Sequence, residues 1–156
     1  MNIKFQRAVD RYAGVPICAL LSLLDLFRRK AKIAAPPRRI LVILLSEMGS
    51  LVLAHPMFAR LKQRYPGATI HVLQFAKNRE VLDLLGVIPA ENVLTLDDSS
   101  LGGLVKDSIR AIRTLRALGV DAVIDCELFA RISSIFSFLS GAPLRAIIRD
   151  TMPFVW

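Results

Sequence analysis

The chain has 156 residues, enough for one domain that buries roughly 70% of the surface its unfolded form exposes. A hydrophobic content of 54% and a mean hydropathy of +0.49 argue against a disordered chain. Residues 1–39 carry nine Lys and Arg against two Asp, whereas residues 40–156 carry twelve against eleven acidic residues. Because the main body is nearly neutral, the composition weighs against a nucleic-acid-binding domain, which needs a basic face.

The N-terminal arm, residues 1–37, contains a predicted amphipathic helix over 12–27 and a linker with Pro36 and Pro37. At 100° per residue, six apolar side chains share one face of this helix: Ile17, Leu20, Leu21, Leu23, Leu24 and Phe27. The run is shorter than a membrane span and contains Asp25, and no small-x-small cleavage site follows it. Two interpretations stay open. The helix lies in an anionic membrane interface, or it packs on the domain or a partner.

Residues 38–156 alternate apolar runs with helical patterns, which predicts an α/β fold with a Rossmann-like parallel sheet covered by helices on both faces. Continuous apolar runs such as residues 40–45 are typical of strands buried on both faces. The other expected strands are 68–75, 92–96, 121–126 and 145–148. Helices are expected at 51–64, 77–85, 101–118 and 129–139, with Gly119 ending the third of these.

The polar turn of residues 46–50 follows the first strand, where ligands bind in open α/β sheets. Gly49 could let the backbone approach an anion at the helix N-terminus, or it could only make the turn. No G-x-G-x-x-G or G-x-x-x-x-G-K-[ST] motif is present. Glu47 is the only carboxylate of the turn and could act as a general base, with Ser46, Met48 and Gly49 around the substrate.

Asp125 and Glu127 come at the end of the fourth expected strand and share one side of it. They could form a paired carboxylate site or cap the helix that follows. His55 is expected to be packed or at the edge of a ligand site, and His71 to be structural. No metal site is expected, and Cys18 and Cys126 fit a reducing cytoplasm better than a disulfide scaffold.

The stretch RILVILLSEMGSLVLAHPMFARLKQRYPGATIHVL resembles the opening of glycosyltransferase family 9, the heptosyltransferase-type enzymes of lipopolysaccharide core assembly. The shared pattern is an apolar strand, a turn with Ser46 and Gly49, a short apolar stretch into Pro56, and a helix that ends near Tyr65 and Pro66. The later VDAVIDCELFARISSIFSFLSGAPLRA is similar to the family's strand ending in Asp, its Arg/Ser helix and its Ser-Gly-Ala-Pro. The resemblance covers about residues 38–150.

This resemblance implies the N-terminal, acceptor-side domain of a GT-B enzyme. The enzyme would be an inverting glycosyltransferase that moves a heptose-like sugar from a nucleotide-sugar to a lipopolysaccharide-type, lipid-linked oligosaccharide. Its expected location is cytoplasmic, peripheral at the inner membrane. The implied partners are the acceptor, an anionic membrane surface and a separate C-terminal donor domain, with no nucleic acid. No cofactor is implied, because the nucleotide-sugar is a substrate of the donor domain, which is absent from these residues.

The chain departs from the family at one site position. The family has an Asp directly after the turn Gly as its base, and this chain has Ser50 there. A serine cannot be the base unaided, so Glu47 is expected to take that role, and the chain alone is expected to be inactive. The alternatives are a non-catalytic Rossmann-like binding module and a membrane-associated interaction protein.

Overall fold

A computed structural model describes residues 35–45, 48–127 and 131–147. Within these ranges the strands are β1 (Arg39–Leu44), β2 (Thr69–Phe75), β3 (Val93–Leu96), β4 (Ala122–Asp125) and β5 (Leu144–Ile147). The helices are α3 (Met48–Arg64), α4 (Arg79–Leu85), α5 (Leu101–Leu118) and α6 (Arg131–Leu139), with short 3-10 turns η2 (Ala76–Asn78) and η3 (Ala90–Asn92). The strands form one parallel sheet in the order β3-β2-β1-β4-β5, which confirms the predicted Rossmann-like α/β fold.

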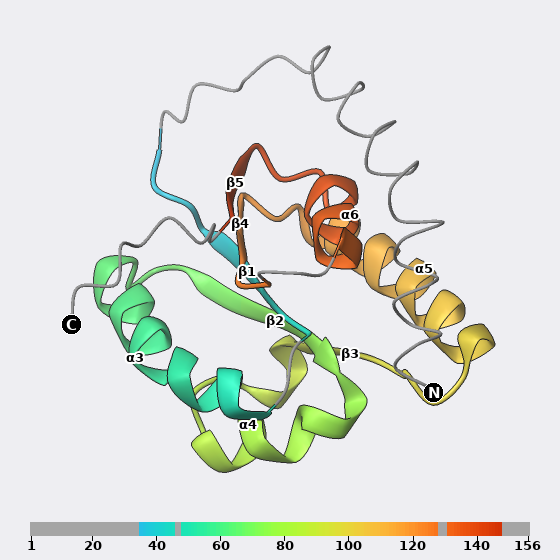
Figure 1. Ribbon diagram of the computed structural model, residues 1–156. Helices are drawn as coiled ribbons and strands as arrows, with labels where there is room; N and C mark the ends of the chain where they lie inside the picture. Colours follow the sequence, from blue (N-terminus) through green and yellow to red (C-terminus); the bar gives the residue numbers. More distant parts are fainter. Residues whose placement is uncertain (1–34, 46–47, 128–130, 148–156) are drawn as a thin grey trace, which may run out of the picture.

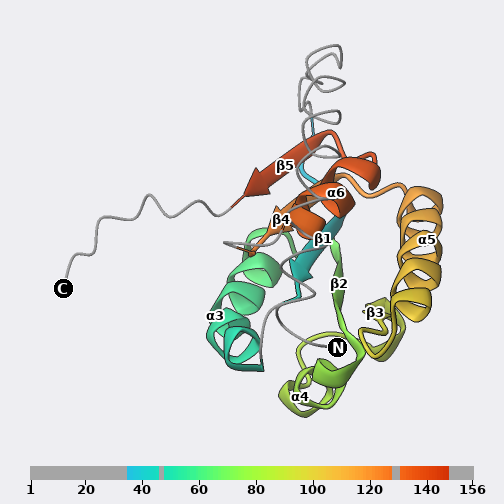
Figure 2. The same ribbon diagram turned by 45° about the vertical axis from the view of Figure 1, so that its right-hand side comes forward.

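Helices cover both faces of the sheet (Figures 1 and 2). Alternate residues of β1 point to opposite faces, so every residue of the strand after Arg39 is buried. Leu41 and Ile43 belong to a core shared with α5 and α6, which contribute Leu115 and Phe136. On the other face, a second core joins the strands to α3 and α4: its residues include Ile40, Val42, Leu44, Leu51, Phe58 and Leu82. The central strand therefore anchors both layers, as expected from its unbroken apolar run.

The ends of α5 are set by side-chain and glycine caps. The Ser100 side chain accepts a hydrogen bond from the Gly103 N–H at 3.1 Å, which satisfies one of the free donors of the first turn. Gly119 ends the helix with φ of 61°, a left-handed conformation that suits glycine. Both ends agree with the helix predicted at residues 101–118.

The structure corrects the predicted start of the helix that follows β1. The sequence patterns predicted a turn at residues 46–50 and a helix from 51, whereas α3 already begins at Met48. A helix's first turn makes few internal N–H bonds, so the weak helix formers Gly49 and Ser50 are tolerated there. Gly49 has no positive φ, and a Cβ added to it would meet no atom within 4 Å. Gly49 is therefore not required by the backbone of a turn.

Several sequence predictions fall outside the described residues. They concern the amphipathic helix at 12–27, the side chains of Ser46, Glu47 and Met48, and the first residues of the helix expected at 129–139. Across the described ranges, no helix is both long enough and apolar enough to cross a bilayer.

Candidate functional site

The strand order places a switch point between β1 and β4. The chain builds outward from β1 through β2 to β3, and then returns to the other side of β1 with β4 and β5. In open α/β sheets, ligands bind in the crevice beyond the carboxyl ends of the strands at such a point. Here the carboxyl edge between β1 and β4, where such a crevice would form, is bordered by Leu45, the first turn of α3 and residues 125–127. Two stretches selected separately from the sequence thus meet at one place.

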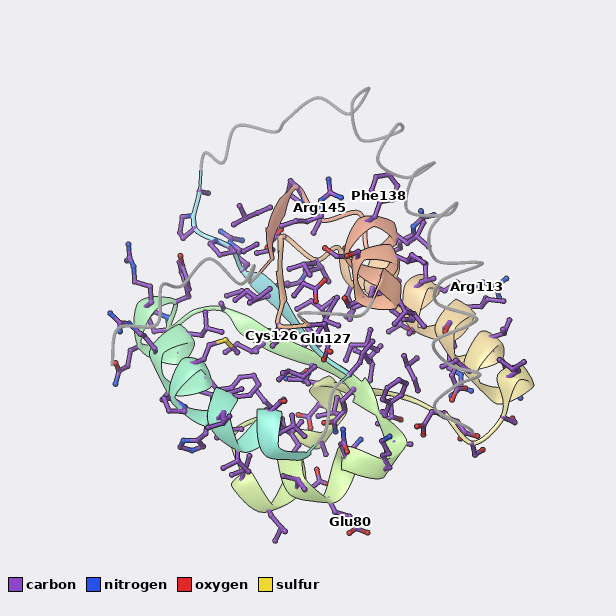
Figure 3. The ribbon with its side chains drawn as sticks, viewed as in Figure 1. Glu80, Arg113, Cys126, Glu127, Phe138 and Arg145 are labelled. Carbon is purple, nitrogen blue, oxygen red and sulfur yellow. The ribbon has the colours of Figure 1, made fainter. Side chains whose placement is uncertain are left out.

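Glu127 joins the ends of the two strands. Its Oε1 accepts a hydrogen bond from the Leu45 N–H at 2.5 Å, and the neighbouring Cys126 N–H donates to the Ile43 carbonyl at 3.1 Å. Figure 3 shows Cys126 and Glu127 beside each other in the interior between the two helical layers. The carboxylate therefore fixes Leu45, the residue that follows β1 and precedes residues 46–47. Neither sequence hypothesis, a paired acid site or a helix cap, predicted this contact with Leu45.

Asp125 is fully buried at the end of β4, on the face of the sheet that α5 and α6 cover. Its Oδ1 accepts a hydrogen bond from the Glu127 N–H at 3.1 Å, while Oδ2 has no hydrogen-bond partner in the described part of the chain. Burial, and secondarily the Glu127 charge, raise the pKa of the Asp125 carboxyl, and hydrogen bonds from the Glu127 N–H and the Ser133 side chain oppose that rise. A carboxyl in such surroundings is a candidate functional group.

Cys126 lies between these two acidic residues and is a free thiol. Burial and the charges of Asp125 and Glu127 raise the pKa of Cys126 to about 12. Because the thiolate is the reactive form of cysteine, this thiol is unsuited to nucleophilic, redox or metal chemistry near neutral pH.

The N-terminus of α3 supplies backbone donors to the same crevice. Gly49 is exposed and Ser50 is half-buried in its first turn, where N–H groups lack helical partners and the helix dipole favours negative charge. These two predicted residues therefore lie where a phosphate or a developing oxyanion could bind. His55 is exposed and lies about 8 Å further along the helix axis than Gly49 and Ser50.

Sequence reasoning missed one polar side chain near this edge. Gln74 is fully buried at the end of β2, where it pairs with Leu44 of β1, so its side chain lies on the face covered by α3 and α4. Neither its Oε1 nor its Nε2 has a hydrogen-bond partner among the described residues. The sequence signal for Gln74 was its single amide side chain in the otherwise apolar run VLQF. Such a group either costs stability or binds a ligand.

His71 lies on β2 as a buried residue, in agreement with the structural role expected for it. Burial, and secondarily the nearby Arg39 charge, lowers the pKa of His71 and so disfavours its charged form. Throughout the described ranges, no cluster of three or more His, Cys, Asp or Glu residues could hold a metal ion.

A hollow of the described surface lies elsewhere. Its volume is about 740 Å³, and it is lined by the second half of α3, from Pro56 to Tyr65. That half of the helix lies at the amino edge of the sheet, because α3 starts beyond β1 and leads back to the beginning of β2. Its position opposite the strand carboxyl ends makes it a weaker candidate than the crevice between β1 and β4.

Two solved structures share this fold. A family 9 glycosyltransferase from Veillonella parvula DSM 2008 matches with a TM-score of 0.62 and 21% identity, over 72% of this chain and 32% of that one. E. coli heptosyltransferase WaaC, solved with ADP-2-deoxy-2-fluoro heptose, matches with a TM-score of 0.50 and 16% identity, over 71% and 35% of the two chains. No protein-family profile and no curated protein matches the sequence. The chain thus spans about a third of the length of two glycosyltransferases whose Rossmann-like fold it shares.

Proposed function

We propose that this chain is the acceptor-binding half of an inverting glycosyltransferase. The reaction would transfer a heptose-like sugar from a nucleotide-sugar to a lipopolysaccharide-type, lipid-linked oligosaccharide at the cytoplasmic face of the inner membrane. One observation carries the proposal: the N-terminus of α3 and the carboxylates of Asp125 and Glu127 meet at the β1–β4 switch point of a fold similar to that of family 9 glycosyltransferases. Acceptor hydroxyls could be bound there by the Glu127 carboxylate and by free backbone donors.

The chemistry requires a base close to the acceptor hydroxyl. In the proposal Glu47 takes the proton, and the resulting oxygen attacks the anomeric carbon of the donor while the nucleotide diphosphate leaves. Glu127 supports this step indirectly, because its bond to the Leu45 N–H fixes the strand end from which residue 47 extends. Asp125 is fully buried and therefore serves the shape of the site rather than the proton transfer.

The donor needs a second binding unit. The nucleotide-sugar would bind to another domain, joined to this one or supplied by a separate chain, and the crevice would close between the two. Stabilisation of the leaving diphosphate would come from that domain and from helix N-termini. The 156-residue chain is accordingly expected to bind acceptor without transferring sugar.

A second candidate is a non-catalytic binding module of the same fold. It is favoured by Ser50, which stands in the first turn of α3 where the resembled family has its carboxylate base. A module of this kind would keep the crevice and lose turnover, even when it is combined with a donor domain.

Titration of the purified chain with a lipid-free core oligosaccharide, followed by NMR amide shifts, tests the proposal. Saturable shifts are expected for residues 48–50 and 125–127, with no response to nucleotide-sugars. A nucleotide response at these residues without an oligosaccharide response would favour the binding module instead. Turnover of a nucleotide-sugar by the 156-residue chain alone would contradict the proposal that acceptor and donor bind to different domains.

A further inference from the structure

The outward face of α5 exposes an apolar stripe. Leu101, Val105 and Ile109 are 41%, 57% and 47% exposed, whereas another side of the same helix packs into the core through Ala111 and Leu115. The three side chains follow each other at intervals of four residues, so they stack along one line of the helix surface. Three large apolar side chains in a row are more than scattered surface exposure.

Basic side chains run beside this stripe. Lys106, Arg110, Arg113 and Arg116 are all exposed, and Figure 3 shows Arg113 on the side of α5 away from the sheet. The single acidic residue of the helix, Asp107, is half-buried: it accepts a hydrogen bond from the Asp97 N–H at 3.1 Å and pairs with Arg110. The outward face of α5 is therefore apolar and cationic, with no exposed acidic side chain.

Charge and size narrow the choice of partner for this face. A stable protein interface needs roughly 20–30 residues a side, far more than one helix stripe offers. The N-terminal arm, residues 1–37, carries a net charge of +5, from seven basic and two acidic residues, so the cations of α5 would repel it. An anionic bilayer fits both the apolar stripe and the basic side chains of α5. The apolar side chains enter the headgroup boundary, while Lys and Arg pair with lipid charges.

We propose that the outward face of α5 docks onto an anionic lipid membrane through Leu101, Val105 and Ile109, with Lys106, Arg110, Arg113 and Arg116 contacting the headgroups. The inference rests on the membrane location in the proposed function and names the folded surface that makes the contact. It does not depend on sugar transfer. In this arrangement α5 lies parallel to the membrane surface, and any contact made by the N-terminal arm is additional.

A tryptophan placed on the stripe tests the contact directly. The chain has one tryptophan, so Ile109→Trp in a Trp156→Phe background reports on α5 alone, and Leu84→Trp in the same background, on the exposed surface of α4, is the matched control. The probe vesicles are made of phosphatidylcholine and phosphatidylglycerol and contain brominated lipid. On binding, the tryptophan emission of the Ile109→Trp variant should shift to the blue and be quenched, while that of the Leu84→Trp variant should not.

Two outcomes of this measurement would overturn the inference. Unquenched emission from the Ile109→Trp variant, in protein that still co-sediments with vesicles, would leave the arm as the contact. No co-sedimentation at all would overturn the inference together with the membrane location. Oligosaccharide binding tests the acceptor role separately, so the two failures can be told apart.

Charge reversal provides a second measurement. Each basic side chain near an anionic surface strengthens binding about fivefold, so Lys106→Glu with Arg113→Glu should weaken vesicle binding by at least about 25-fold. Arg60→Glu with Arg64→Glu makes the same change of charge on exposed residues of α3 and should have a small effect. Equal losses from the two double variants, with unchanged melting temperatures, would mean that only net charge matters and would overturn a docking face on α5. If the α5 double variant fails to fold, the tryptophan measurement decides alone.

Discussion

Polar groups differ in their hydrogen bonding between the amino edge of the sheet, where the strands begin, and the carboxyl edge, where they end. At the amino edge, Asp121 Oδ2 accepts hydrogen bonds from the Arg38 and Arg39 N–H groups at 2.8 and 2.9 Å. The Arg39 side chain in turn donates to the Leu118 carbonyl at the end of α5, and the Asp121 N–H donates to the Arg39 carbonyl. At the carboxyl edge, Asp125 Oδ2 and the Gln74 amide are buried without hydrogen-bond partners in the described part of the chain.

This difference separates the part of the sheet that stabilises the domain from the part that can bind. Polar groups that bond to each other lower the free energy of the folded chain, whereas buried groups without partners raise it. Strained or unsatisfied groups persist where a ligand uses them. Substitutions at the amino edge should therefore affect stability alone, whereas substitutions at the carboxyl edge should also affect affinity and rate.

The largest effect is expected for Glu47, which comes between Leu45 and α3 in the sequence. In a complete enzyme that contains the donor domain, Glu47→Gln should lower kcat by roughly 10²–10⁴-fold, the usual contribution of a general base. Melting temperature should change little, because the substitution keeps size and polarity. Near-normal turnover of Glu47→Gln, combined with loss of turnover in Ser50→Ala, would assign the role to Ser50.

Much of the fold could be predicted from the sequence because the local signals agree with each other. The apolar run of β1 and the glycine after α5 indicated the correct element types and nearly correct boundaries. Strand order was not accessible in this way, since a parallel sheet is assembled by crossovers that no local pattern specifies. The meeting of Leu45 with Glu127 and the burial of Gln74 both depend on that order. The start of α3 at Met48 was missed because helix propensity says little about a first turn.

Glu127 is the next test of the carboxyl edge. Glu127→Ala removes the acceptor of the buried Leu45 N–H and should lower the free energy of unfolding by about 1–3 kcal/mol. Glu127→Gln is the control, because its amide oxygen can still accept this bond. The NMR shift of the Leu45 amide should move in the first variant and not in the second. Equal melting temperatures for all three proteins would show that the bond contributes nothing to the strand end.

Asp121→Ala probes the amino edge. Two backbone N–H groups lose their acceptor, but both are exposed enough for water to replace it, so the expected loss is about 1 kcal/mol. Asp121→Asn can keep one amide oxygen in place and should lose less. Acceptor affinity should stay the same in both variants. A loss of affinity without a loss of stability would contradict the separation of the two edges.

Asp125→Asn should raise stability, unlike Glu127→Ala and Asp121→Ala, and the size of the gain should depend on pH. The pKa of Asp125 is raised in the folded chain, so the protonated carboxyl contributes stability that is complete below the unfolded pKa of 3.8 and is lost as pH rises through the folded pKa. Asparagine cannot ionise, and its side-chain oxygen can still accept the Glu127 N–H bond. The melting temperature of Asp125→Asn relative to the native chain should therefore increase from about pH 4 to about pH 8. A difference that does not vary with pH would show that Asp125 keeps an ordinary pKa.

Gln74→Leu should have the smallest effect on stability, and it separates two explanations for the buried amide. Leucine has a similar volume and no polar atoms, so removal of an unbonded amide should leave the melting temperature unchanged or raise it slightly. Oligosaccharide affinity should fall by about 2–10-fold if the amide bonds to an acceptor hydroxyl, the range of one neutral hydrogen bond. Gln63→Leu, on the exposed surface of α3, is the matched control and should change neither quantity. A clear fall in melting temperature for Gln74→Leu, with unchanged affinity, would mean that the amide has a structural partner, and the carboxyl edge would then hold one fewer group available for binding.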